Sequence, residues 1–258
     1  MKPFEIITVA THDEGTYRQL IHNDYDVSIN TLGYGKSWEG FMMKYRLVYE
    51  HIQDKEDDLI VVFLDGFDSL INGDPKEAIQ CFLDQDKKVL YSVDKITNPI
   101  QGFVYNRVFH AKDNPHHLNS GMYIGYVKYL KIFLKKVLTS KYTSDQKATI
   151  ELFHQFDFVG TDENEYIFRN KLMQRKCVLS KEDPPFVSFP GKLYSNRLYR
   201  SIFEYSQYFI DIHVVFFLAV SSTLYMNRLF IPLSLFTFLY GVLFSAIDKS
   251  SFYAKGWV

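Results

Sequence analysis

Two kinds of hydrophobic periodicity alternate along most of the chain. Compact apolar runs predict buried strands, and segments with an apolar residue every three or four positions predict amphipathic helices. The predicted strands are residues 4–9, 27–32, 59–64, 89–93, 122–125 and 186–188. The predicted helices are residues 42–52, 76–82, 126–138 and 144–153. Because strands alternate with helices, the pattern predicts an α/β fold around a largely parallel sheet.

The hydrophobic pattern changes near the end of the chain. Residues 229–247 contain no charged residue, and about 20 apolar residues span the core of a bilayer. A shorter apolar run, residues 212–226, is interrupted only by His213, and Asn227-Arg228 would form a tight turn between the two runs. The pattern predicts a transmembrane helix or hairpin: both runs insert, or only the second spans. A buried helical hairpin within the core of a globular domain is the alternative.

The composition fits a chain made of two different parts. Of its 258 residues, 47% are hydrophobic and 17% aromatic, while the mean hydropathy is only −0.14. This average combines a charged α/β domain, residues 1–200, with a Phe- and Leu-rich membrane anchor, residues 201–258. The 29 basic and 30 acidic residues give a net charge of −1. That balance excludes a nucleic-acid binder acting through bulk positive charge.

The cysteines and charged residues predict where the chain resides. Cys81 and Cys177 are far apart and form no CxxC pattern, which argues against a disulfide framework and a structural zinc site. The first apolar run is short and is followed at once by polar residues, unlike a signal peptide. Basic residues flank the predicted hairpin on both sides: Lys192, Arg197 and Arg200 before it, Lys249 and Lys255 after it, with only Arg228 in the turn. We therefore expect a membrane protein whose α/β domain faces the cytosol.

Two carboxylates follow the most apolar predicted strand. Residues 59–64 lead into Asp65-Gly66-Phe67-Asp68, and open α/β sheets bind ligands beyond the carboxyl ends of their strands. Carboxylates, phosphates and water are the ligands that Mg²⁺ and Mn²⁺ prefer. Asp65 and Asp68 therefore predict a metal ion bound together with a diphosphate. The alternative is a simple turn, for which Asp-Gly is a common signal.

A phosphate-binding P-loop is a weaker alternative. Gly35-Lys36-Ser37 resembles the end of that motif. The full motif requires a glycine five positions before Gly35. Asn30 stands there, and Trp38 follows where the helix should begin, so the pattern argues against a P-loop hydrolase.

Several segments resemble, in order, the glycosyltransferase domain of the procollagen lysyl hydroxylases and the related collagen hydroxylysine glycosyltransferases. They are Thr8-Val9-Ala10-Thr11, Leu32-Gly33-Tyr34-Gly35-Lys36-Ser37-Trp38, Phe63-Leu64-Asp65-Gly66-Phe67-Asp68, Leu118-Asn119-Ser120-Gly121-Met122-Tyr123-Ile124-Gly125, Ser144-Asp145-Gln146, and Asp162 with Ile167-Phe168-Arg169-Asn170. The resemblance extends from about Ile6 to Lys192. It implies a GT-A type fold, a UDP-sugar donor and Mn²⁺ or Mg²⁺.

The resemblance also implies roles for individual residues. Asp65 and Asp68 would bind the metal ion. Val9, Ala10, Thr11 and Trp38 would contact the nucleotide. Asn119, Ser120 and Gly121 would line the sugar site. Asp145 would face the acceptor hydroxyl, as a base if the reaction inverts the anomeric centre. From the residues alone, Asn119 is equally a turn residue and Asp145 an acidic residue favoured at a helix N-terminus.

The chain departs from the family pattern in three places. Ser188 stands where the family has a histidine metal ligand, the glycine-rich stretch after Trp38 is shortened to Glu39-Gly40, and a hydrophobic segment takes the place of a hydroxylase domain. We expect transfer of galactose or glucose to a hydroxyl of a protein or glycan, with hydroxylysine or galactosyl-hydroxylysine of a collagen-like protein favoured. A catalytically silent relative that binds glycan, nucleotide sugar or protein, and a transferase acting on surface polysaccharide, remain alternatives.

Overall fold

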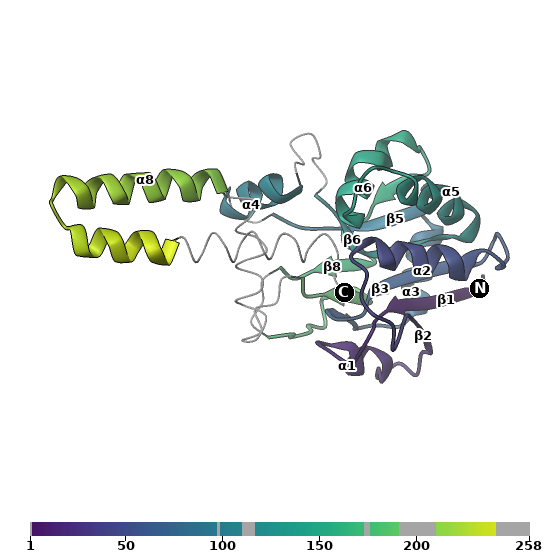
Figure 1. The fold of residues 1–258 in the computed structure, drawn as a ribbon. Helices are drawn as coiled ribbons and strands as arrows, with labels where there is room; N and C mark the ends of the chain where they lie inside the picture. Colours follow the sequence, from purple (N-terminus) through teal and green to yellow (C-terminus); the bar gives the residue numbers. More distant parts are fainter. Residues whose placement is uncertain (1, 97–98, 110–116, 173–175, 191–209, 241–258) are drawn as a thin grey trace. The chain divides into compact units, whose positions relative to one another are not determined.

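The computed structural model describes residues 2–96, 99–109, 117–172, 176–190 and 210–240. The chain divides into two compact units, Met1–Leu193 and Tyr194–Val258. The first unit holds all the strands of the described chain (Figure 1). Its α/β architecture confirms the fold class expected from the alternating pattern.

A six-stranded mixed sheet forms the centre of the first unit, in the order β2-β1-β3-β6-β5-β7. Its strands are β1 (Phe4–Val9), β2 (Ile29–Leu32), β3 (Ile60–Asp65), β5 (Val89–Val93), β6 (Leu118–Tyr126) and β7 (Val159–Thr161). Only β6 runs antiparallel to its neighbours. A smaller sheet has the order β4-β9-β8, from β4 (Ser69–Ile71), β9 (Phe186–Ser188) and β8 (Phe168–Asn170).

Helices and the small sheet cover the two faces of the central sheet. On one face, α2 (Met42–Ile52), α5 (Val127–Leu138) and α6 (Asp145–Leu152) pack against Ile7, Val61 and Phe63. On the other face, α1 (Tyr17–Ile21), α3 (Pro75–Leu83) and the small sheet pack against Ile6, Val62 and Leu64. Successive residues of β1 and β3 thus enter different cores, because strand side chains point alternately to opposite faces. Double coverage explains why these strands are largely apolar.

Two predicted strands differ by two or more residues from their bounds in the structure. The strand predicted at 27–32 begins only at Ile29, and the strand predicted at 122–125 extends over all of β6. The predicted helix at 76–82 is confirmed as α3, whose first turn Asp74 caps by accepting a hydrogen bond from the Lys76 N–H at 2.9 Å. The hydrophobic pattern missed α1, β4, β7, β8, the 3₁₀ turn Phe153–Gln155 and α4 (Pro99–Phe109).

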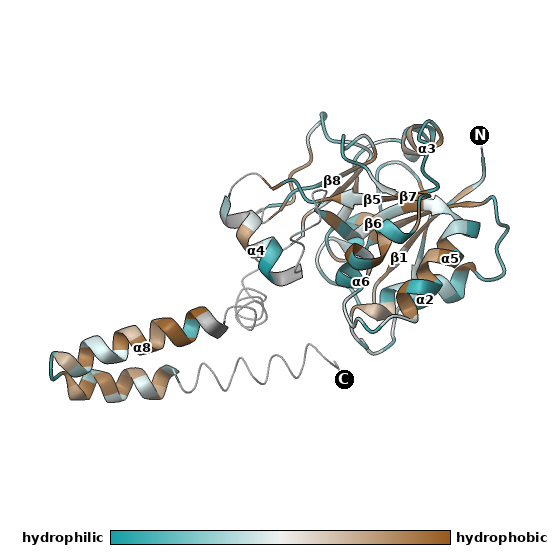
Figure 2. Ribbon diagram, turned by 90° about the horizontal axis from the view of Figure 1, so that it is seen from above, coloured by the Kyte–Doolittle hydropathy of each residue, from teal (hydrophilic) through white to brown (hydrophobic). Residues whose placement is uncertain are grey.

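The described part of the second unit contains two packed helices. Helix α8 (Ile210–Met226) is followed by a helical stretch at residues 230–240. The two contact each other through Phe217 and Phe236, whose ring centroids lie 5.6 Å apart, and through His213 and Tyr240. Both are largely hydrophobic along their length (Figure 2). The turn at Asn227-Arg228, where Arg228 has φ of +57°, separates them.

The predicted membrane span lies in this second unit, and part of it falls on described residues. Among the helices that the structure describes, none is both long and apolar enough to cross a membrane. Residues 241–247 of the second predicted run lie outside the described residues.

Candidate active site

Polar residues gather at one edge of the central sheet. Strands β1, β2, β3 and β5 all run toward this edge, and antiparallel β6 begins there. The residues at these strand ends are Ala10-Thr11, Gly33–Gly35, Asp65, Asp94 and Asn119-Ser120. This is the position where open α/β sheets bind their ligands, and it brings together motifs that are far apart in sequence.

A buried lysine joins two of the predicted site residues. The Nζ atom of Lys44, on α2, lies 3.0 Å from Oδ2 of Asp65 and 3.0 Å from Oδ2 of Asp145. Lys44 is only 7% exposed and Asp145 3%. Burial alone would lower the pKa of Lys44, but the charges of Asp145 and Asp65 outweigh it and raise that pKa above its ordinary value. The site therefore contains a permanent cation between two carboxylates.

The sequence analysis missed Lys44, although a signal was present. Lys44, Val48 and Ile52 are spaced by four residues and all lie on the buried side of α2. A lysine at such a position must be paired, because an isolated charge is strongly disfavoured in a protein interior. Its spacing therefore indicated a carboxylate partner, but only the folded chain identifies Asp65 and Asp145.

The sugar-site residues of the resemblance lie beside this cluster. The hydroxyl of Ser120 donates to Oδ2 of Asp145 at 3.2 Å. Asn119 accepts a hydrogen bond from the Gly121 N–H at 2.7 Å and donates from Nδ2 to Oδ1 of Asp94 at 2.9 Å. The side chain of Asn119 is thus held from both ends of its amide group.

Asp94 is a second residue that the sequence analysis missed. It follows β5 and is 5% exposed. Burial raises its pKa to about 7, against the hydrogen bonds from Asn119 and Asn170, which act to lower it. A carboxyl group that titrates near neutral pH in a candidate site is a typical sign of function, although structural networks also produce it.

Ser188 and Asp68 are brought together by the small sheet. Strand β9 pairs with β4 so that Ser188 faces Ser69, next to Asp68. The Ser188 hydroxyl donates to Oδ1 of Asp68 at 3.2 Å, and Asp68 C=O accepts from the Phe189 N–H at 2.8 Å. The residue at the family's histidine position therefore lies against the second predicted metal carboxylate.

The residues predicted to contact the nucleotide are largely buried. Val9 and Ala10 belong to the core, and Thr11 is 7% exposed. Thr11 C=O accepts from the Gly35 N–H at 2.9 Å, which joins the turn after β1 to the turn after β2. Trp38 is partly buried against the core, with its ring edge-on to Phe41. A ligand would therefore meet this segment mainly through its backbone.

The donor set suits a hard divalent cation only in part. No cluster of three or more His, Cys, Asp or Glu side chains occurs in the described part of the chain. Asp65 and Asp68 supply carboxylate oxygens, and a Cβ added at Gly121 would lie 3.8 Å from the Asp65 Cβ, so glycine keeps space beside that carboxylate. Because Mg²⁺ and Mn²⁺ often bind one or two carboxylates and complete their shell with substrate phosphates and water, these residues fit such an ion.

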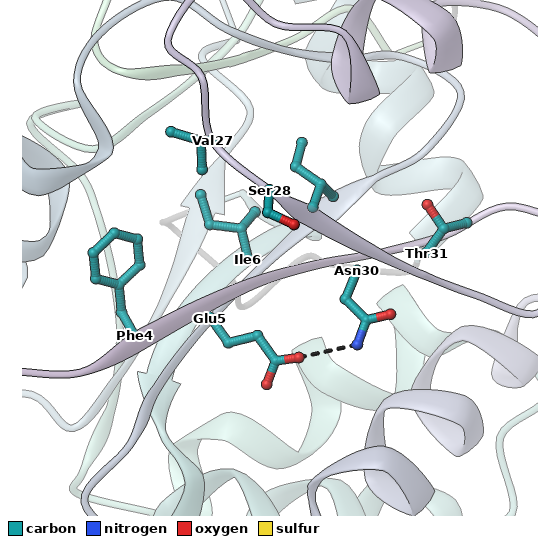
Figure 3. Close-up of a pocket in the computed structure, with 8 residues that line it drawn as sticks. Phe4, Glu5, Ile6, Val27, Ser28, Asn30 and Thr31 are labelled. Atoms are coloured by element: carbon teal, nitrogen blue, oxygen red, sulfur yellow. Dashed lines mark hydrogen bonds between the residues drawn. The ribbon is translucent and has the colours of Figure 1, made fainter.

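A cavity of about 680 Å³ lies elsewhere, along the first half of β1 and residues 27–31, which lead into β2 (Figure 3). Its polar contact is between Glu5 and Asn30, 3.0 Å apart. Hydrogen bonds from Asn30, His51 and Lys55 outweigh burial and lower the pKa of Glu5. None of the candidate site residues lines this cavity.

Fold and site together define an α/β protein with an ion-paired polar site at the carboxyl ends of its strands. The family profile of the PLOD GT domain matches residues 1–174. The chain belongs to this family.

This chain matches only part of the length of its curated relatives. Human procollagen-lysine,2-oxoglutarate 5-dioxygenase 2 is 28% identical over 187 residues, which cover 67% of this chain and 24% of that protein. Human multifunctional procollagen lysine hydroxylase and glycosyltransferase LH3 is 27% identical over 135 residues, covering 47% of this chain and 18% of that protein. This chain thus corresponds to about a quarter or less of these relatives.

Among solved structures, the galactosyltransferase LgtC in complex with donor and acceptor sugar analogs is 14% identical. The alignment covers 72% of this chain and 87% of that chain, with a TM-score of 0.42. The bifunctional enzyme WbbM is 12% identical over 74% of this chain and 46% of that chain, with a TM-score of 0.44. These scores are too low to bear on the assignment, which rests on the family match.

Proposed function

We propose that this protein is a metal-dependent glycosyltransferase of GT-A type that transfers galactose or glucose from a UDP-sugar to a hydroxyl acceptor. The observation that carries the proposal is the cluster of Lys44, Asp65 and Asp145 at the carboxyl edge of the sheet. It lies within the region that matches the PLOD GT domain.

The carboxylates and the lysine would have different roles toward the donor. Asp65 and Asp68 would hold Mn²⁺ or Mg²⁺ together with the donor diphosphate. When bound, the ion would neutralise negative charge that develops on the departing nucleotide. Lys44 adds a fixed positive charge beside Asp65. Such preorganised charges stabilise a developing anion without reorganising during the reaction.

Asn119, Ser120 and Asp145 would face the sugar and the acceptor. Because Asp94 and the Gly121 N–H hold the Asn119 amide, it can present a defined edge to a sugar hydroxyl. Asp145 is held by Lys44 and Ser120, which orients its carboxylate. If the reaction inverts the anomeric centre, an acceptor hydroxyl hydrogen-bonded to Asp145 would transfer its proton there as the new glycosidic bond forms and the bond between the sugar and UDP breaks.

The favoured acceptor is hydroxylysine or galactosyl-hydroxylysine of a collagen-like protein. Support comes from the family and from the LH3 name, which joins a procollagen lysine hydroxylase with a glycosyltransferase. A hydroxyl of a surface polysaccharide is the other acceptor class to assay.

The experiment is a direct assay of sugar transfer. UDP release and glycosylated product would be measured with UDP-glucose and UDP-galactose, with Mn²⁺ and with chelator, on hydroxylysine peptides and on polysaccharide. The wild type should show metal-dependent turnover, and Asp65→Asn and Asp68→Asn should abolish it. Asp57→Asn is the matched control, because Asp57 is 64% exposed and pairs with Lys131 outside the site. A folded wild type without turnover on either donor would refute the proposal.

A catalytically silent relative is the second candidate function, and Ser188 is the observation that favours it. A serine hydroxyl is a poorer metal ligand than the histidine of the family pattern, and here it donates to Asp68. In this case the protein would bind a nucleotide sugar or glycan without transferring it. Binding of UDP with Mn²⁺ in the absence of turnover would distinguish the two.

The second unit is proposed to associate with a lipid surface, with its flanks on the cytosolic side. On α8, His213 and Phe217 face the second helix. The residues on the remaining circumference include exposed Ile212, Val215 and Leu218. Apolar side chains on so much of a hairpin surface suit lipid better than water. The full chain should float with phosphatidylcholine–phosphatidylserine vesicles in a density gradient, and a chain truncated after residue 209 should not.

A further inference from the structure

Tyr34 has an exposed side chain whose ring packs against a buried neighbour. The ring is 57% exposed and stacks on Tyr17, with centroids 5.7 Å apart and an interplanar angle of 25°. Tyr17 is itself buried, and its hydroxyl donates to Oγ1 of Thr31 at 3.1 Å. One face of the Tyr34 ring is therefore backed by a fixed neighbour, and the side chain remains open to solvent.

The backbone around Tyr34 is also held in place. Gly33 and Gly35, on either side, have φ values of +80° and +79°, which favour glycine. The Gly35 N–H donates to Thr11 C=O, and the Lys36 N–H donates to Gly33 C=O at 3.0 Å. This turn therefore fixes where Tyr34 projects, next to the segment that the resemblance assigns to the nucleotide.

The order of strands places Tyr34 at one end of the candidate site. Moving along the edge from β2 through β1 to β3 leads from Tyr34 past Thr11 to Asp65, and β6 then brings Asn119. Neighbouring strands are about 4.8 Å apart, so Tyr34 and Asp65 are on strand ends separated by about 10 Å. A nucleoside diphosphate-sugar extended along this edge, with its diphosphate at Asp65 and its sugar at Asn119, would direct its base toward β2.

We propose that Tyr34 stacks on the base of the donor nucleotide and supplies a base contact beyond that of Trp38. This inference rests on the proposed function. Trp38 is partly buried against the core, so Tyr34 offers the more open ring. Base–aromatic stacking tolerates different bases; the contact would therefore strengthen nucleotide binding without selecting uracil by itself.

The test measures binding by calorimetry, on the full chain in the presence of Mn²⁺, with UDP and with inorganic pyrophosphate as probes. Tyr34→Ala should weaken UDP binding by roughly 5- to 150-fold, the range expected for loss of one stacked base. It should leave pyrophosphate binding unchanged. Tyr34→Phe, which keeps the ring, should bind UDP like the wild type. Tyr166→Ala is the matched control, since Tyr166 is also 57% exposed.

The outcomes separate this inference from the proposed function. Equal UDP affinity in the wild type and Tyr34→Ala would overturn the role of Tyr34 and leave the transferase proposal standing. A parallel loss of UDP and pyrophosphate binding in Tyr34→Ala would also overturn it, because the effect would not depend on the base. A folded wild type that binds neither UDP nor UDP-sugars would overturn the donor site as a whole.

Discussion

The Nζ atom of Lys44 lies 3.0 Å from Oδ2 of Asp145, although β3, β5 and β6 of the central sheet lie between their two helices in sequence. The same ammonium group contacts Asp65 at the end of β3. This bridge connects the carboxylate expected at the metal with the carboxylate expected at the acceptor. Lys44 depends on these two carboxylates to offset the burial of its charge.

Replacing Lys44 with methionine should destabilise the fold. It would leave two carboxylates close together without their cation, and removal of one partner of a buried ion pair costs about 3–5 kcal/mol. Urea denaturation followed by circular dichroism would measure the free energy of unfolding. Lys131→Met is the control: Lys131 pairs with exposed Asp57, and such pairs contribute about 0–1 kcal/mol. Equal losses in the two variants would contradict the importance of the buried bridge.

Asp94 should make stability depend on pH between about 4 and 7. Its folded-state pKa of about 7 exceeds its ordinary value of 3.8, so the folded protein binds this proton more tightly than the unfolded chain. The stabilisation is complete below pH 4 and is lost as pH rises through 7. The free energy of unfolding of the wild type minus that of Asp94→Asn should therefore fall over this window, by up to about 1.4 kcal/mol per pH unit. Parallel pH curves for the two proteins would exclude the shift.

Gly121→Ala should impair sugar transfer more than folding. An added Cβ would meet Oδ1 of Asn119 at 2.9 Å and would displace the amide that bonds to the Gly121 N–H. We expect KM for the UDP-sugar to rise or kcat to fall, while the melting temperature changes little. Gly102→Ala in α4 is the control, because its Cβ would make only an ordinary contact at 3.4 Å with Ile96. Unchanged kinetics in Gly121→Ala would show that the Asn119 position is not needed.

Ser188→His should increase affinity for Mn²⁺. The Ser188 hydroxyl lies 3.2 Å from Oδ1 of Asp68, and an imidazole nitrogen is a better metal ligand than a serine hydroxyl. The affinity would be measured by calorimetry with MnCl₂ and UDP. Ser188→Ala would serve as the comparison, since it removes the hydroxyl without adding a ligand. Equal Mn²⁺ affinity in the histidine and alanine variants would mean that position 188 does not reach the ion.

Several parts of the fold could be predicted because local patterns carry them. Apolar runs marked β1, β3 and β5, and the Asp74-Pro75 pair marked the start of α3. The hydrophobic pattern gave no signal for β4, β7 and β8, which have three residues each. Such short strands exist only because partners from distant parts of the chain supply their hydrogen bonds. The expected strand at 122–125 was too short for the same reason: β6 gains its first residues by pairing with β5.

The sequence alone determined which residue types could do chemistry and roughly where each one stands. Asp65 ends an apolar strand, Asn119-Ser120-Gly121 lies at the start of another, and Asp145 begins a helix. Only the tertiary structure decided that Lys44 is the partner of Asp65 and Asp145, that Asp94 holds Asn119, and that Ser188 lies against Asp68. The physical reason is that hydrogen bonds and ion pairs between distant residues depend on strand order and helix packing. Hydrophobic periodicity fixes which face of an element is buried, but it does not determine which polar side chains meet when the faces come together.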